Sequence, residues 1–202
     1  MMQLDILIVF LFSTFALTLS PGPDIIYVFY RSISNGKLSG IRTVFGLTTG
    51  LFFHTLLLIF GISIFIKNND SLFFIIKLFG CVYFVFLAFK TLFFLKKNEK
   101  FINKKKDNDF LIGLMMNVLN PKVSLFFIAF FPGFIFHDNL SYQIQFLILG
   151  LLFWLIATLT FLLIVLISSR FKSQFQNLIG SNFVKYSQVL IFIFISFWII
   201  NS

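Results

Sequence analysis

The chain has 202 residues, of which 59% are hydrophobic and only 11% are charged. A water-soluble fold of this length does not hide so much apolar surface, so the composition excludes an ordinary soluble domain and predicts an all-α integral membrane protein. The net charge of +9 would suggest nucleic-acid binding in a soluble protein, but here the basic residues fall between hydrophobic stretches and mark cytoplasmic loops, so no nucleic-acid partner is expected.

Six hydrophobic stretches are each long enough to span a bilayer. In chain order they lie near 4–31, 41–66, 71–95, 110–133, 141–168 and 183–200. The first stretch lacks the basic start and the cleavage site of a signal peptide, so it is expected to be retained as a helix. The sequence therefore predicts six transmembrane helices joined by short polar segments.

The polar segments alternate in their content of basic residues. The first carries Arg31, Lys37 and Arg42, the third Lys96, Lys97, Lys100 and Lys104 to Lys106, the fifth Arg170, Lys172 and Lys185, and the second and fourth carry Lys67 alone. Basic loops stay in the cytoplasm, so both termini are expected on the outer side of the membrane. The third segment, about 96–109, is also compatible with an anionic-lipid site.

A weak internal repeat divides the chain into halves. A shift of 100 residues places Pro21 on Pro121, Gly50 on Gly150 and Gly80 on Gly180. The pattern predicts a single transmembrane domain over 1–202, with repeat one at about 1–95, a basic loop at about 96–109 and repeat two at about 110–202. Three helices per half is an odd number, so the second repeat would be inverted, as in many secondary transporters.

Helices one and four are each expected to break at a proline. Ser20-Pro21 in "LSPGPD" and Asn120-Pro121 in "LNPKVS" both place a favoured N-cap residue before a proline that is favoured at the first helical position. Each pair predicts the end of one half-helix and the start of another, with Ser20 and Asn120 as the caps. The free N–H groups of such starts favour an anion, for example a substrate carboxylate. Two proline kinks without a ligand are the alternative.

Two ionisable residues stand within a turn of these breaks. Asp24 and Lys122 would each cost roughly 2.5 to 3.5 kcal/mol inside a membrane, so they are expected to face a cavity and to approach each other. Asp24 would bind a substrate ammonium or carry a coupling proton, and Lys122 would bind a carboxylate or hold Asp24 ionised. The alternatives are a structural ion pair, or a Lys122 that extends toward the cytoplasm. The predicted substrate-binding residues are Ser20, Pro21, Gly22, Pro23, Asp24, Asn120, Pro121 and Lys122.

The remaining polar and small residues have weaker predicted roles. His54 is a second candidate for proton coupling, with a hydrogen-bonded packing residue as the alternative. Gly46 and Gly50 form a GxxxG close-packing motif, Gly80 is assigned a structural role, and Asn117 is expected to satisfy carbonyls freed by the second break. With only two histidines and one cysteine, Cys81, neither a metal centre nor a cofactor is predicted.

These motifs resemble those of the LysE/RhtB family of amino-acid exporters. The similarity begins at "SPGPD", runs through "YRSISNGKLSGIRTVFGLTTGLFFH", and returns in "IIKLFGCVYFVFLAFK" and "NVLNPKVSLFFIAFFPGF". The last two helices are only generically hydrophobic. The resemblance implies a transporter rather than an enzyme, which exports amino acids or close derivatives across the bacterial inner membrane by antiport with protons. Its expected partners are the amino acid, protons and the lipid bilayer, and a homo-oligomer is left open.

Other functions would need features that are scarce here. A metal-cation exporter needs a cluster of Cys, His or carboxylate ligands, and a membrane thiol-electron carrier needs more than one cysteine. A membrane enzyme needs a nucleophile with its base and orienting group. A non-transporting scaffold remains as an alternative, although it would not need charges at two matched helix breaks. The motifs do not select one amino acid.

Overall fold

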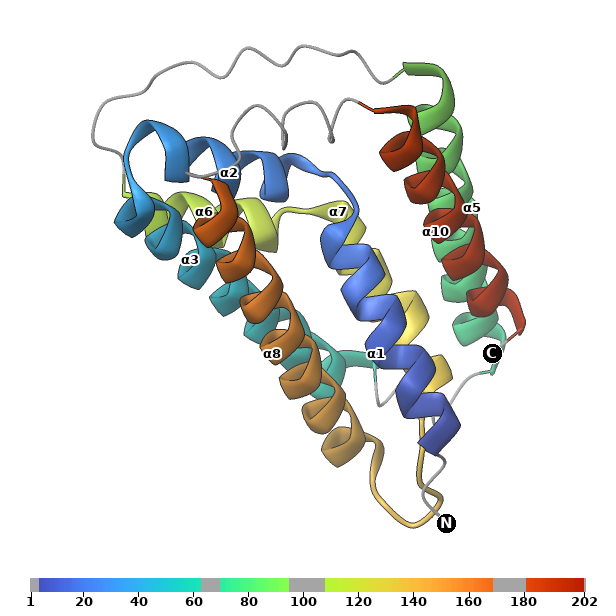
Figure 1. Cartoon of the computed structure of the whole chain (residues 1–202). Coiled ribbons are helices and arrows are strands. Elements are labelled where there is room, and N and C mark those ends of the chain that lie inside the picture. The colour runs from blue at the N-terminus through green and yellow to red at the C-terminus, as the bar shows by residue number, and fades with distance from the viewer. Residues whose placement is uncertain (1–3, 63–69, 95–107, 169–180, 202) are drawn as a thin grey trace.

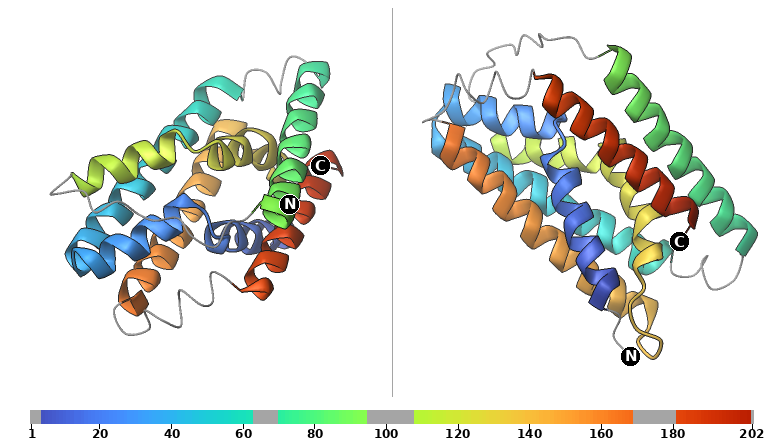
Figure 2. Two further views of the ribbon diagram at one scale, coloured as in Figure 1. Left: turned by 90° about the horizontal axis from the view of Figure 1, so that it is seen from above. Right: turned by 45° about the vertical axis from the view of Figure 1, so that its right-hand side comes forward.

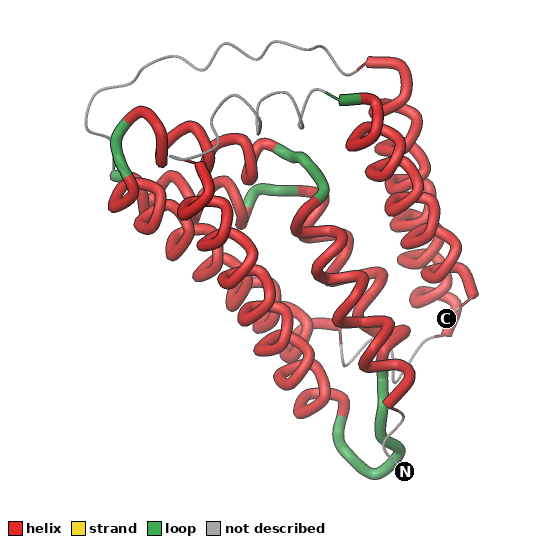
Figure 3. Tube along the Cα trace, viewed as in Figure 1, coloured by secondary structure: helices red, strands yellow, loops and turns green. Residues whose placement is uncertain are grey.

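The computed structural model describes residues 4–62, 70–94, 108–168 and 181–201, and their regular structure is helical throughout (Figures 1 and 3). Lys67, Gly180 and the basic residues predicted for the third and fifth polar segments, Lys96 to Lys106, Arg170 and Lys172, lie outside these ranges. The elements are α1 (Leu4–Leu19), α2 (Pro23–Ser34), α3 (Lys37–Leu57), the π-helical turn η1 (Leu58–Ile62), α5 (Asp70–Phe94), α6 (Asp109–Val118), α7 (Pro121–Leu125), the π-helical turn η2 (Phe126–Phe130), the 3-10 turn η3 (Phe131–Phe134), α8 (Tyr142–Ser168) and α10 (Asn182–Asn201).

Four of the described helical segments are long and apolar enough to cross a membrane, and up to six spans result if each bent pair counts as one. The first bent pair is α1 with α2, which meet at 58°, and the second is α6 with the segment Pro121–Phe134, which meet at 46°. The predicted all-α class is confirmed, and both predicted breaks are present. Because these segments are helical, they pair their own backbone N–H and C=O groups, as a bilayer requires.

The two bent pairs run in opposite directions through the bundle (Figure 1). α1 rises from the end of the bundle where the N-terminus lies, and α2 continues from the break toward the other end. α6 lies near α2 and leads back to the second break, from which α7, η2 and η3 return toward the starting end (Figure 2). α3 and α8 pack together along one side, and α5 and α10 along the other. The two breaks therefore meet in the interior.

Aromatic side chains of the segment that follows the second break pack against three other helices. Phe126, Phe127, Phe130, Phe131 and Phe134 of η2 and η3 are fully buried. They contact Phe10 of α1, Phe153 of α8 and Trp198 of α10. One short segment thus holds three helices in place, while the phenylalanines on the outer face of α5, such as Phe79 and Phe86, are exposed where lipid would cover them.

Glycines allow α3 and α6 to cross at close range. A β-carbon added at Gly46 would collide with the backbone carbonyl of Phe110, and one added at Gly113 would collide with the carbonyl of Thr43. Gly50, one turn along, faces the side chain of Asn117 in the same way. The GxxxG motif of α3 therefore lies against α6, where small residues let two backbones approach.

Replacing Gly113 by alanine is expected to destabilise the protein by about 1–3 kcal/mol, because the added methyl group has backbone on its far side and cannot be accommodated by a side-chain movement. Gly61 is the matched control, since a β-carbon there meets no atom of the described residues within 4 Å. Thermal unfolding of the two variants in the same detergent measures the difference. Equal melting temperatures for Gly113→Ala and Gly61→Ala would contradict the close crossing.

Candidate functional site

The first helix restarts two residues later than the sequence suggested. α2 begins at Pro23 with Gly22 as its N-cap, so the prediction of Ser20 as cap and Pro21 as first residue was wrong. The reason is that the N–H of Ser20 still donates to the carbonyls of Ala16 and Leu17, at 3.0 and 3.2 Å, and so Ser20 ends α1. Gly22 has no side chain to cap the amides of α2.

The second helix restarts at the residues that the sequence indicated. Asn120 is the N-cap of α7, and its side-chain oxygen accepts the backbone N–H of Lys122 at 3.0 Å. Pro121 is the first helical residue. Asp24 and Lys122 therefore occupy the same position in their half-helices, the residue after the leading proline.

These two residues form a loose ion pair between the breaks. The Nζ atom of Lys122 lies 3.7 Å from Oδ2 of Asp24, and the two residues are only 8% and 4% exposed. The same ammonium donates to the carbonyls of Leu17 and Ser20, at 3.4 and 3.3 Å. A cation is favourable at the carbonyl end of a helix, so Lys122 closes the C-terminus of α1 while it faces Asp24.

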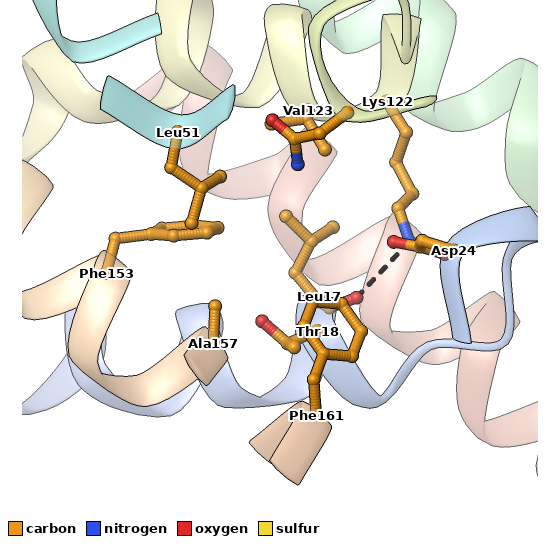
Figure 4. Close-up of a pocket in the computed structure, with 10 residues that line it drawn as sticks. Leu17, Thr18, Asp24, Leu51, Lys122, Val123, Phe153, Ala157 and Phe161 are labelled. Atoms are coloured by element: carbon orange, nitrogen blue, oxygen red, sulfur yellow. Dashed lines mark hydrogen bonds and ion pairs between the residues drawn. The ribbon is translucent and has the colours of Figure 1, made fainter. Parts of the chain in front are cut away.

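A small cavity lies beside this pair (Figure 4). Its polar lining consists of Thr18, Asp24, Asn117 and Lys122. Its apolar lining consists of Leu17, Leu51, Val123, Phe153, Ala157 and Phe161. The cavity measures about 10 Å³, which is room for about one water molecule. The lining side chains therefore leave little free space between them.

Two buried oxygens of the cavity lining have no hydrogen-bond partner among the described residues. They are Oδ1 of Asp24 and Oδ1 of Asn117. Leaving such groups unpaired costs free energy, so each is available to a ligand that donates hydrogen bonds. Gly22 provides the space for the carboxylate, because a β-carbon at this position would lie 2.6 Å from Oδ1 of Asp24 and 3.2 Å from Nζ of Lys122.

The other predicted substrate-binding residues surround the pair without lining the cavity. The carbonyl of Pro21 accepts a hydrogen bond of 2.9 Å from the side chain of Gln188 on α10, which attaches the first break to a distant helix. The hydroxyl of Ser20 and the side-chain nitrogen of Asn120 are buried without a partner in the described part of the chain. The breaks thus carry more polar atoms than the fold itself uses.

His54 and Asn117 connect α3 to the end of α6. The Nε2–H of His54 donates to the backbone carbonyl of Asn117 at 3.2 Å, and its ring packs against Phe53 and Phe127. His54 closes the C-terminus of α6 much as Lys122 closes that of α1, and it does not line the cavity. The Asn117 side chain lies against Gly50 and makes no hydrogen bond to a carbonyl of the break. Farther away, Gly80 of α5 packs against Ala129.

Arg31 and Asp109 form a second buried ion pair, which was not predicted from the sequence. Arg31 was predicted to lie in a cytoplasmic loop. Its placement in a loop was wrong, because α2 continues to Ser34 and the turn to α3 comprises only residues 35–36, while its position on the cytoplasmic side stays a prediction. Arg31 is 4% exposed and pairs with Asp109 in the first turn of α6. The Ser39 hydroxyl donates to Oδ2 of Asp109 at 2.6 Å. The pair ties α2, α3 and α6 together at the end of the bundle away from the termini.

The side chains that converge at this site are not a set of metal ligands. Within residues 4–62, 70–94, 108–168 and 181–201, no group of three His, Cys, Asp or Glu side chains could hold a metal ion. The groups that converge are one carboxylate, one ammonium, an amide and apolar side chains. Such a set can bind a small molecule that carries both charges and an apolar part.

Comparison with known proteins gives the family. Residues 15–199 match the family described as LysE type translocator. The uncharacterized membrane protein YrhP of Bacillus subtilis strain 168 is 32% identical over 183 residues, which cover 79% of this chain and 86% of that protein. An uncharacterized membrane protein of Haemophilus influenzae is 27% identical over 195 residues, which cover 92% and 88%.

A third relative is named for a function. The leucine efflux protein of Enterobacter sp. strain 638 is 28% identical over 144 residues, which cover 67% of this chain and 66% of that protein. No solved structure matches the chain. The family match extends over both breaks and over nearly all of the helices. The protein therefore belongs to the LysE type translocator family, whose members are multi-pass membrane transporters rather than enzymes.

Proposed function

We propose that the protein exports amino acids or close derivatives from the bacterial cytoplasm in exchange for protons. The observation that carries the proposal is the loose ion pair of Asp24 and Lys122, which lies at a cavity where two helix breaks meet. At 3.7 Å the ammonium of Lys122 and the carboxylate of Asp24 are too far apart for a hydrogen bond. Each can therefore form a closer contact with an oppositely charged group of a ligand. The leucine efflux relative supports an amino-acid substrate.

An amino acid complements this pair because it is a zwitterion. Its ammonium would bind Asp24, whose Oδ1 has no partner among the described residues, and its carboxylate would bind Lys122. Site and ligand each have a net charge of zero, so binding buries no uncompensated charge, which is the condition for charges at membrane depth. A ligand with only one of the two charges would leave either Asp24 or Lys122 unpaired.

Transport requires that the cavity open alternately to the two sides. Room for about one water molecule does not admit an amino acid, so the helices around the breaks must separate. We propose six spans arranged as two inverted repeats, in which each bent pair is one span of its repeat and one repeat rocks against the other. In this arrangement the protein lies in the inner membrane with both termini on the outer side. The start of α1 and the end of α10 lie toward the same end of the bundle in Figure 1, which supports placing both termini on one side of the membrane.

Asp24 is the better placed of the two candidates for proton coupling. It lines the cavity, whereas His54 is engaged with Asn117 outside the lining. A protonated Asp24 no longer attracts an ammonium, so the carboxylate holds either the substrate or a proton. This competition is the physical basis of an exchange of one for the other. A metal-cation exporter is not favoured, because the lining contains a lysine and a single carboxylate.

Transport by the purified protein in lipid vesicles tests the proposal. Vesicles loaded with a panel of radiolabelled amino acids are diluted into buffer of equal or lower pH, and protein-free vesicles serve as the control. Release of at least one amino acid is expected to depend on the protein and to quicken when the outside is acidic. Release that matches protein-free vesicles for every amino acid would contradict an amino-acid exporter.

A further inference from the structure

We infer that the substrate is a neutral amino acid with an apolar side chain, whose size is limited by Ala157. The inference deepens the proposed function and rests on it. It begins from the division of the cavity into two ends, which Figure 4 shows: Asp24 and Lys122 face each other at one end, and Leu51, Phe153 and Ala157 lie at the other. With the α-amino and α-carboxyl groups bound at the charged end, the side chain of the amino acid points toward the apolar one.

The lining has no charge left for a charged side chain. Asp24 and Lys122 are the charged members of the described lining, and the backbone groups of the substrate use both. The side chain of lysine, arginine, aspartate or glutamate would bring a third charge into contact with leucine and phenylalanine. A buried charge without a partner is strongly disfavoured, so these amino acids are excluded.

Among the described residues, the lining offers a hydroxylated side chain one uncharged acceptor without a partner, Oδ1 of Asn117. The Thr18 hydroxyl already donates to the carbonyl of Thr14 at 2.8 Å, which leaves Asn117 as the uncharged polar group without a partner in the lining. Six of the ten lining residues are apolar, and they come from α1, α3, α7 and α8. Contact with a branched or linear aliphatic side chain buries apolar surface on each of these walls.

The α8 wall sets the size of the side chain. Phe153, Ala157 and Phe161 follow one another at four-residue intervals, so they lie on one face of the helix. Ala157 stands between two rings and is the smallest side chain of the lining. Leu51 of α3 closes the same end. Adding volume at Ala157 and removing it at Leu51 should therefore change substrate preference in opposite directions.

The experiment measures competition between amino acids for release from vesicles. In the wild-type protein, valine, leucine and methionine are expected to be exported at least about tenfold faster than lysine, glutamate or serine, which is the discrimination that such a pocket gives. Ala157→Leu is expected to raise the ratio of the alanine export rate to the leucine export rate by on the order of tenfold. Leu51→Ala is expected to lower the ratio of the leucine export rate to the phenylalanine export rate by a similar factor. Leu56→Ala is the matched control, because Leu56 is on the same helix but 50% exposed.

The outcomes separate this inference from the proposed function. Export of lysine, glutamate or serine in preference to the apolar amino acids overturns the inference and leaves an amino-acid exporter. The inference is also overturned if Ala157→Leu and Leu51→Ala are both active but show the same ratios of export rates as Leu56→Ala. Export of no amino acid by the wild-type protein overturns both. If either Ala157→Leu or Leu51→Ala fails to fold, the change in the ratio of export rates in the other variant still tests the inference.

Discussion

Replacing Asp24 by asparagine is expected to reduce export by about 30-fold or more, since breaking one side of a buried charge pair costs about 2–5 kcal/mol. The variant keeps the size of the side chain but loses the charge that attracts the substrate ammonium, and it leaves the buried Lys122 without its carboxylate. Initial rates of release, with equal amounts of protein in the vesicles, measure the effect. Export at the wild-type rate and with the wild-type pH dependence would show that Asp24 does not take part.

A double variant distinguishes a substrate site from a structural ion pair. Asp24→Asn with Lys122→Met removes both charges, so the unpaired buried charge of the single variant disappears and the thermal stability is expected to return toward that of the wild type. Export is expected to remain as low as in the single variant, because the zwitterion has lost both contacts. Recovery of export together with stability would mean that the pair serves only the fold.

The second large effect is expected at Asp109. Replacing it by alanine strands the guanidinium of Arg31, which is buried between α2 and α6, and should destabilise the protein by about 3–5 kcal/mol. Arg31→Met combined with Asp109→Ala leaves no unpaired charge, so most of this loss should be absent in the double variant. The matched control is Asp5→Ala, in the exposed first turn of α1, with a change of under about 1 kcal/mol.

These free energies are measured by unfolding the wild type, the two single variants and the double variant in one detergent and following circular dichroism. Equal stability of the Asp109→Ala and Asp5→Ala variants would show that the Arg31 pair contributes nothing. A double variant as unstable as Asp109→Ala alone would assign the loss to Asp109 itself, through the hydrogen bond from Ser39, rather than to the stranded arginine.

The helices could be predicted because each is a local property of the sequence. Hydrophobic runs of spanning length gave the stretches near 141–168 and 183–200, and the structure has helices over Tyr142–Ser168 and Asn182–Asn201. Both breaks followed from a polar residue before a proline. The exact restart of the first could not be derived, because "SPGPD" offers two prolines, and only the hydrogen bonds of Ser20 to α1 show that the second one begins the helix.

The site was only partly predictable for a different reason. Asp24 and Lys122 stood out because charges are rare in apolar stretches, and their approach was expected from the matching breaks. Arg31 did not stand out, because it adjoins a polar turn where an arginine normally marks a loop. Its partner Asp109 comes from a segment 78 positions away, and nothing in the local sequence links the two. Leu51 and Ala157 likewise join the cavity only through the packing of α3 against α8.

Recognition of both ends of a zwitterion is the central claim, and a binding competition tests it most directly. The purified protein is equilibrated with the radiolabelled amino acid that it exports fastest, and the unlabelled amino acid, its methyl ester and its N-acetyl derivative are added as competitors. The ester lacks the carboxylate that would face Lys122, and the N-acetyl derivative lacks the ammonium that would face Asp24. Both are expected to compete at least about tenfold less well than the amino acid, since each leaves one buried charge unpaired. Equal competition by all three compounds would contradict a site built on Asp24 and Lys122.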